Sequence, residues 1–206
     1  MNRANARRLL SSYLEAPAVR VLTGLGLSPN AVTLLGLLIA GISAFLASRG
    51  YLLAGGAALL VSGVFDMLDG SVARATDRVT RYGGLVDSVT DRVAESLVLL
   101  GLLLFYLFDA DRSSPVGALL VYLALAGSVM VSYVRARAEG LGIECKVGIM
   151  TRPERIAALG TGLILGQWWE PALILVLGAV AALSILTSAQ RVLHVLRAIK
   201  AEDAGS

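Results

Sequence analysis

Residues 65–91 read FDMLDGSVARATDRVTRYGGLVDSVTD and contain two pairs of aspartates. Asp66 and Asp69 are three residues apart, and Asp87 and Asp91 are four residues apart. Both spacings put the two carboxylates of a pair on one face of an α-helix, about one turn apart. Because the connection between the two predicted helices is short, we expect them to be antiparallel neighbours whose acidic pairs can face each other.

The sequence around these acids is strongly apolar. The chain has 206 residues, of which 56% are hydrophobic and only 16% are charged, and its mean hydropathy is +0.75. Soluble domains contain roughly 45–50% apolar and about 25% charged residues. A membrane-spanning helix needs about 20 predominantly apolar residues. The composition therefore predicts an all-α integral membrane protein and excludes a disordered chain.

The apolar segments predict a single domain over residues 1–206 with six transmembrane helices. A basic, amphipathic segment over residues 2–25 precedes them and is typical of a helix that lies in the membrane interface, with a break expected near Pro17. The predicted spans are residues 31–48, 52–75, 84–108, 115–138, 153–168 and 171–197.

The distribution of basic residues predicts the topology. Arg49 lies in the first turn between spans and Arg112 in the third, while the other 16 of the 18 basic residues lie at the N-terminus, the second and fourth connections, the C-terminus or the adjoining helix ends. Because basic residues collect on the cytoplasmic side, we expect a multi-pass protein of the plasma membrane. Both termini and the active site are expected to be cytoplasmic, with Trp168 and Trp169 as interfacial anchors on the other side.

Four carboxylates at a membrane boundary indicate a metal site. Each ionisable group inside a membrane costs about 2.5–3.5 kcal/mol, so such groups usually mark function. Ligation by carboxylates alone favours hard ions such as Mg²⁺, Mn²⁺ or Ca²⁺, and four carboxylates suit two ions. Pairing with nearby arginines in a solvated loop is the alternative, which the helical spacing inside apolar sequence disfavours. The single His194 and the single Cys145 exclude a His or Cys cluster, and we expect the first to make a local polar contact and the second to be incidental.

Residues 66–91 resemble the signature of the CDP-alcohol phosphotransferase family, D-x2-D-G-x2-A-R-x8-G-x3-D-x3-D. All eight fixed positions are present, namely Asp66, Asp69, Gly70, Ala73, Arg74, Gly83, Asp87 and Asp91. The six-span pattern is similar to that of the family as well, so the resemblance covers nearly the whole chain. It implies a homodimeric membrane enzyme that moves a phosphoryl-linked alcohol from a CDP-alcohol to a second alcohol and releases CMP.

The resemblance also implies roles for single residues. Asp66, Asp69 and Asp87 would bind two divalent ions, Mg²⁺ or Mn²⁺ as a substitute, while Asp91 would lie at the same site and act as the base. The CDP-binding residues it implies are Asn30, Asp69, Gly70, Ala73 and Arg74. Asn30 belongs to a P-N-x-x-T segment with Pro29 and Thr33, which can also be read simply as the start of a helix.

A second group of charges, the basic cluster, bears on the acceptor alcohol. Arginine suits bidentate contact with phosphate, so the cluster can form an anion pocket, although basic residues also serve topology and attract anionic lipids. The segments SYVRARAE (132–139), RPER (152–155) and QR (190–191) resemble the inositol-phosphate branch of the family. That resemblance implies CDP-diacylglycerol or CDP-archaeol as donor and inositol 1-phosphate as acceptor. The basic cluster consists of Arg135, Arg137, Lys146, Arg152, Arg155 and Arg191.

Two other functions stay open at this point. A phosphatidylglycerol-phosphate synthase would use glycerol 3-phosphate, an anion that also wants an arginine pocket. A metal-ion transporter would use the carboxylates, but it has no use for the fixed glycines or for Arg74. Besides the two substrates, membrane lipids and a second copy of the chain are the expected partners, and no nucleic acid is expected.

Overall fold

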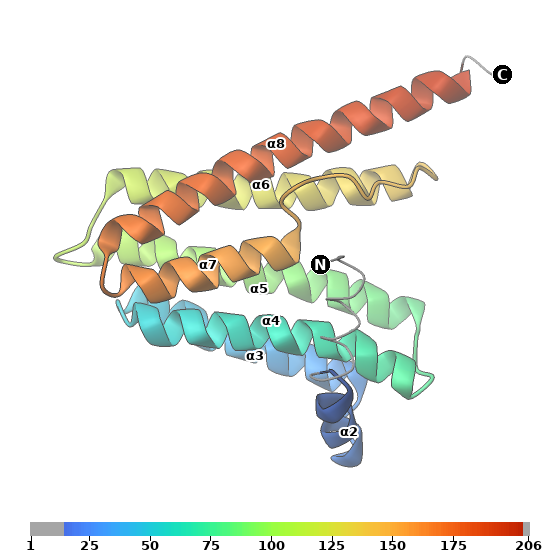
Figure 1. Ribbon diagram of the computed structural model, residues 1–206, viewed down its shortest axis with the longest axis horizontal. Helices are drawn as coiled ribbons and strands as arrows, with labels where there is room; N and C mark the ends of the chain where they lie inside the picture. Colours follow the sequence, from blue (N-terminus) through green and yellow to red (C-terminus); the bar gives the residue numbers. More distant parts are fainter. Residues whose placement is uncertain (1–14, 204–206) are drawn as a thin grey trace, which may run out of the picture.

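The structure, a computed structural model, describes residues 15–203. This part of the chain forms seven α-helices and no strand (Figure 1), so the predicted all-α fold is confirmed for it. The helices are α2 (Ala16–Gly24), α3 (Pro29–Ser48), α4 (Leu52–Ala75), α5 (Arg81–Phe108), α6 (Pro115–Glu139), α7 (Arg152–Gly166) and α8 (Glu170–Asp203). The first part of the predicted interfacial helix over residues 2–25 lies outside the described residues. Its second part is α2, which carries Pro17 in its first turn.

Local sequence explains where the helices begin. The Ser28 hydroxyl accepts a hydrogen bond from the third residue of α3, and Pro29 occupies its first position. Ser114 caps α6 in the same way. At the start of α7 the Glu154 carboxylate accepts the backbone N–H of Thr151 at 3.0 Å, as in a capping box. Such caps satisfy amides that have no partner inside the helix, so they fix the helix ends.

The observed helices follow the predicted spans to within a few residues. Four of the described helices, α3, α4, α6 and α8, are long and apolar enough to cross a bilayer. The first half of α5 is polar, and α7 has only 15 residues and ends at Gly166 rather than residue 168. The described part of the chain is thus all-α, with four helices of the length and composition of membrane spans, while α5 and α7 do not have both properties.

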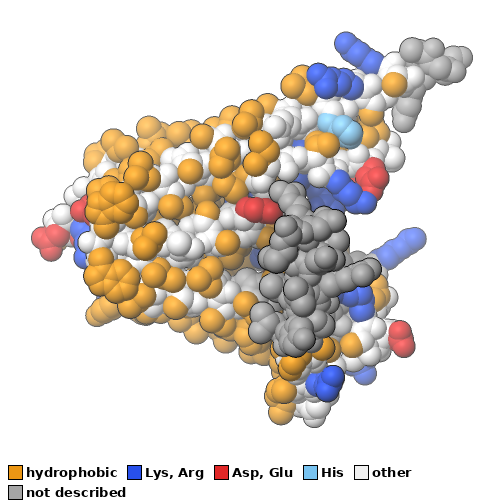
Figure 2. Space-filling model, in the orientation of Figure 1, with side chains coloured by type: hydrophobic (Ala, Val, Ile, Leu, Met, Phe, Trp, Pro, Cys, Tyr) orange, Lys and Arg blue, Asp and Glu red, His pale blue; other side chains and the backbone are white. Residues whose placement is uncertain are grey.

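The bundle has two distinct ends (Figure 1). The α4–α5 turn, the loop over residues 140–151 and the C-terminal end of α8 lie at one end, which is also where Lys and Arg side chains gather in Figure 2. Hydrophobic side chains cover the visible flank of the helices. α2 lies across the bundle at the same end as the α4–α5 turn and packs on α4. This placement suits a helix in the membrane interface.

Inside the bundle, α3 packs on α4 and α5, while α6 packs on α8. α7 joins these two groups because it packs on both α4 and α8. The contact between α4 and α7 is close: a Cβ atom on Gly56 would lie 2.6 Å from the carbonyl oxygen of Gly160. Small residues allow such an approach between membrane helices. α7 is therefore held near the helix that carries the first acidic pair.

Candidate active site

The four aspartates of residues 65–91 lie on two neighbouring helices. Asp66 and Asp69 belong to α4, and Asp87 and Asp91 belong to α5. One oxygen from each of Asp66, Asp69 and Asp87 lies within 4.8 Å of the others. The structure therefore brings three of the four carboxylates into one group, here called the acidic trio, and leaves Asp91 beside it.

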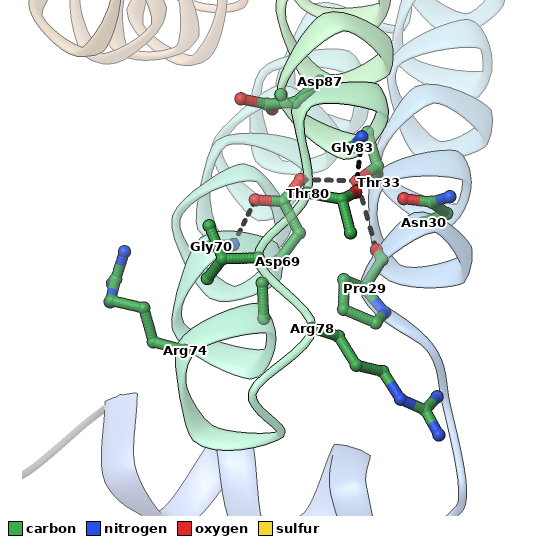
Figure 3. A pocket seen from close by; sticks show the side chains of 13 residues that line it. Pro29, Asn30, Thr33, Asp69, Gly70, Arg74, Arg78, Thr80, Gly83 and Asp87 are labelled. Atoms are coloured by element: carbon green, nitrogen blue, oxygen red, sulfur yellow. Dashed lines mark hydrogen bonds between the residues drawn. The ribbon is translucent and has the colours of Figure 1, made fainter.

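Hydrogen bonds fix the most deeply placed member of the trio. Asp69 is 5% exposed, and the Thr33 hydroxyl donates to its Oδ2 atom at 2.7 Å. The backbone N–H of Gly70 donates to the other oxygen. Figure 3 shows Thr33 reaching from α3 to Asp69 on α4. Two donors thus orient this carboxylate, and the sequence had associated Thr33 only with the entry to the first span.

Two arginines contact the remaining acids. The Arg152 guanidinium pairs with Asp66 and lies 2.7 Å from Oδ1 of Asp91. Arg92 lies 3.3 Å from Oδ2 of Asp91. The contact between Arg152 and Oδ1 lacks hydrogen-bond geometry, so this buried oxygen has no hydrogen-bond partner. Asp91 is therefore held beside the trio by ion pairs with both arginines.

These residues fit a divalent cation. The acidic trio offers carboxylate oxygens, the ligands that Mg²⁺ and Mn²⁺ prefer. Two guanidinium groups cannot neutralise four carboxylates, and the orphaned Oδ1 of Asp91 adds a further unsatisfied acceptor. An additional cation would lower the mutual repulsion of these carboxylates. Asp66, Asp69 and Asp87 are thus the residues that would hold it.

A cavity of about 260 Å³ adjoins the trio, and Figure 3 views it from close by. All five residues that the resemblance implied for CDP binding line it. Arg74 and Arg78 extend on either side of it in this view. The lining residues are Pro29, Asn30, Thr33, Asp69, Gly70, Ala73, Arg74, Arg78, Val79, Thr80, Gly83, Gly84 and Asp87.

The turn between α4 and α5 forms one wall of this cavity and contains residues that the sequence analysis missed. Asp77 has a positive φ of 53°, and the backbone N–H of Arg78 donates to the carbonyl oxygen of Ala73 at 2.9 Å. This pattern is a Schellman cap, which reverses the chain after a helix. It places Arg78 and Thr80 at the cavity. The polar composition of the turn was the available signal for them.

Three members of the basic cluster, here called the inner arginines, are buried or largely buried. Arg152 contacts the acids as described above. Arg155 is 1% exposed, and its Nε and Nη2 atoms donate to Glu95 at 2.6 and 2.9 Å. Arg191 is 3% exposed and donates to the carbonyl oxygens of Val131 and Val147 at 2.7 and 2.9 Å. Arg155 and Arg191 are thus built into the protein interior.

The other three members, the outer basic residues, lie on the surface. Arg135 pairs with Glu139 on the same helix at 2.9 Å. Lys146 pairs with Glu144 in the loop after α6, and this hydrogen bond holds the pKa of the Glu144 carboxyl below its usual value. Arg137 is exposed in the last turn of α6. The structure therefore divides the predicted cluster into an inner and an outer part.

Glu95 is the second residue that the sequence analysis missed. It is 4% exposed and binds Arg155, and the Ser128 side chain also hydrogen-bonds to it. Its position continues the spacing of four residues from Asp87 and Asp91. That spacing was a usable signal, because it puts all three acids on one face of α5.

The two minor sequence predictions concern the loop over residues 140–151. His194 makes the expected local polar contact, since its Nε2 atom lies 3.1 Å from the carbonyl oxygen of Glu144. Cys145 is buried as a free thiol in a small apolar cluster with Ala138 and Ile143. Neither residue lines the cavity beside the acidic trio.

The chain is similar to several known proteins over most of its length. The chain is 39% identical over 198 residues to the archaetidylinositol phosphate synthase of Methanothermobacter thermautotrophicus, and the match covers 94% of each protein. It is 34% identical over 190 residues to the phosphatidylinositol phosphate synthase of Mycobacterium tuberculosis, with 89% of this chain and 86% of that protein covered.

Solved structures of the Mycobacterium tuberculosis phosphatidylinositol phosphate synthase share the fold. The form with CDP-DAG bound has a TM-score of 0.80 at 34% identity and covers 88% of this chain and 93% of that one. The form in complex with manganese and citrate has a TM-score of 0.81 at 33% identity and covers 89% of both chains. In addition, residues 26–201 match the family described as CDP-alcohol phosphatidyltransferase. This chain belongs to the CDP-alcohol phosphatidyltransferase family.

Proposed function

We propose that this protein transfers a phosphatidyl-type group from a CDP-linked lipid to inositol 1-phosphate and releases CMP. One observation carries the proposal: the acidic trio adjoins a cavity that is lined by all the residues implied for CDP binding. The names of the relatives support the acceptor, and the CDP-DAG bound to a structural neighbour supports the donor. The donor would be CDP-diacylglycerol or CDP-archaeol.

We also propose that the protein spans the plasma membrane six times, with both termini and the active site on the cytoplasmic side. Four long apolar helices support this arrangement. The second half of α5 is apolar, and α7 packs between α4 and α8 along the bundle. The gathering of basic side chains at the end that carries the acids supports the orientation. A homodimer is part of the proposal.

On the donor side, the cavity would hold the CDP moiety, with Asn30, Gly70 and Ala73 in its wall and Arg74 and Arg78 at its edges. Two divalent ions, Mg²⁺ in the cell with Mn²⁺ as a substitute, would be held by the four aspartates, Asp69 being fixed by Thr33. When bound, such ions neutralise the diphosphate and stabilise the departing CMP. The lipid chains would then extend from the cavity into the bilayer.

On the acceptor side, Asp91 would accept the proton of the attacking inositol hydroxyl. Its carboxylate is held beside the acidic trio by Arg92 and Arg152, which positions it to accept a proton there. The hydroxyl oxygen forms a bond to the phosphorus that carries the lipid, and the bond from that phosphorus to CMP breaks. The proton goes to Asp91, and the phosphatidyl-type group stays on the inositol.

The phosphate of the acceptor would bind in the basic cluster. Arg152 is the best-placed member, because it lies at the acids and its buried Nε atom has no hydrogen-bond partner. Arg155 and Arg191 would line the inner side, although both have internal partners. Arg135, Arg137 and Lys146 would contribute from the surface, where their charges attract anions from the cytoplasm.

The reaction can be tested with the purified protein. CMP release is measured with CDP-diacylglycerol and Mg²⁺ in the presence of inositol 1-phosphate, glycerol 3-phosphate or serine, and the series is repeated with CDP-archaeol. We expect release with inositol 1-phosphate and its abolition by excess EDTA. If only glycerol 3-phosphate supports CMP release, the acceptor is glycerol 3-phosphate and the family assignment still holds. Full activity in excess EDTA would contradict the metal-dependent mechanism.

A further inference from the structure

Two ion pairs join α5 to α7. Arg152 lies 2.7 Å from Asp91, and Arg155 donates to Glu95 at 2.6 and 2.9 Å. Asp91 and Glu95 are four residues apart on α5, while the two arginines are three residues apart on α7. Each spacing is about one helical turn, and the two helices run in the same direction along the bundle (Figure 1). The two pairs are therefore successive bridges between the same two helices.

The two bridges differ in burial. The side chains of Arg152 and Asp91 are 15% and 14% exposed, and Arg152 also pairs with Asp66. Those of Arg155 and Glu95 are 1% and 5% exposed. Arg155 makes a further hydrogen bond, at 3.3 Å, to the carbonyl oxygen of Met150, just before α7. The inner bridge is thus enclosed, bidentate and tied to the start of α7, which makes it the more rigid of the two.

Side chains, rather than backbone packing, set the start of α7 relative to α5. α7 packs on α4 and α8. Its first turn carries Arg152, whose buried Nε atom has no hydrogen-bond partner and whose Nη1 atom contacts the acids. A small rotation of this turn would move the guanidinium away from Asp66 and Asp91. The inner bridge is the contact one turn further along α7 that opposes such a rotation.

We infer that Glu95 is a positioning residue: by binding Arg155 it fixes the first turn of α7 and thereby holds the Arg152 guanidinium against Asp66 and Asp91. Glu95 itself touches no substrate. The inference rests on the proposed function for the identity of the acceptor, but not for the position of Arg152. Arg152 then places a fixed positive charge beside the acidic trio, where an anionic acceptor would bind.

The test compares Glu95→Gln, Arg152→Gln and the double variant. We expect each single change to raise the KM for inositol 1-phosphate about tenfold, the size of one lost hydrogen bond to a charged group, with little change in the KM for the CDP-lipid. Because Glu95 acts through Arg152, the double variant should lie within about twofold of the single variants. Multiplying effects of the two changes on KM would overturn the inference.

A second measurement needs no substrate. Mn²⁺ binding to the purified protein is followed by electron paramagnetic resonance. Removing a positive charge beside the trio should tighten Mn²⁺ binding, so Arg152→Gln and Glu95→Gln should both lower the dissociation constant several-fold. A merely structural role for Glu95 would weaken Mn²⁺ binding together with the fold, and that result would also overturn the inference.

Two further variants keep the test decisive. Glu139→Gln opens the exposed pair with Arg135 and should change Mn²⁺ binding by less than about twofold. If Glu95→Gln fails to fold, Glu95→Asp keeps the charge but shortens the reach to Arg155. A higher KM for inositol 1-phosphate and a lower dissociation constant for Mn²⁺ are then expected as well. Failure of the proposed function would appear as a different acceptor for the wild-type protein, while the Mn²⁺ result would stand unaffected.

Discussion

The acidic site and the basic cluster lie at the same end of the bundle, but they are assembled in different ways. The four aspartates come from one helical hairpin, α4 and α5, within 26 residues of sequence. The six basic residues come from α6, the loop after it, α7 and α8. The acidic site thus depends on a local turn, whereas the basic cluster depends on how two groups of helices pack. Substitutions in the acidic site should therefore reduce catalysis before stability. Substitutions in the basic cluster should first disturb the packing of the helices.

The largest effect is expected in the acidic site. Asp87→Asn removes one of three oxygen donors of the trio, so CMP release should fall at least about 100-fold, as when a stabilising group at a reacting centre is lost. The control is Asp77→Asn, because Asp77 lies in the nearby turn at positive φ, which Asn tolerates. Equal losses in both variants would mean that the hairpin, rather than the trio, had been disturbed.

The next effect should appear in the basic cluster as lost stability. Arg191→Met breaks two hydrogen bonds, to Val131 and Val147, and should cost about 2 kcal/mol of unfolding free energy. Thermal unfolding in detergent measures this loss. Arg197→Met on the exposed side of α8 is the matched control and should be nearly neutral. An unchanged melting temperature with a raised acceptor KM would assign Arg191 to binding alone.

A third change acts on the contact that joins the two regions. Gly56→Ala places a methyl group 2.6 Å from the Gly160 carbonyl oxygen and must push α7 away from α4. We expect a loss of about 1–3 kcal/mol, as for other overpacked cores, together with a raised acceptor KM. Gly41→Ala meets nothing within 4 Å and gains the same helix propensity, so it should be neutral or stabilising. Similar melting temperatures for the two variants would contradict the tight α4–α7 contact.

The smallest effect is expected at the outer basic residues. Lys146→Gln removes an exposed pair with Glu144, and solvent screens such pairs strongly. The acceptor KM should therefore rise by no more than about threefold. Steady-state kinetics at low and high salt would check this, since screening should remove the remaining difference. A tenfold effect would move Lys146 into the pocket itself.

Sequence reasoning reached the acidic site because its geometry is local. The spacings of Asp66, Asp69, Asp87 and Asp91 on two helices joined by a short turn determine which carboxylates can meet. The helix ends were accessible for the same reason, since caps such as Ser28 act within three residues. Both kinds of prediction use only the period of the helix and the chemistry of its first turn.

The basic cluster could not be resolved in this way. Whether an arginine is free or engaged depends on partners far along the chain, such as Glu95, 60 residues before Arg155, and Val131, 60 residues before Arg191. Composition shows the charges but not these pairings. The same limitation hid Glu95, whose spacing from Asp91 suggested a shared face but gave no sign of its partner.

The shortness of α7 has a consequence for the biogenesis of the protein. With 15 residues it is about 22 Å long, less than the roughly 30 Å hydrocarbon core of a bilayer, and it carries Arg155 in its first turn. During synthesis, such a short segment with a charged residue would insert poorly into lipid without a protein partner. Its counter-charge Glu95 is made 60 residues earlier. We therefore expect α5 to be inserted into the membrane first, so that α7 inserts in contact with α5 and not with lipid alone. Proteinase protection of truncated nascent chains, with and without Glu95→Ala, would reveal this order.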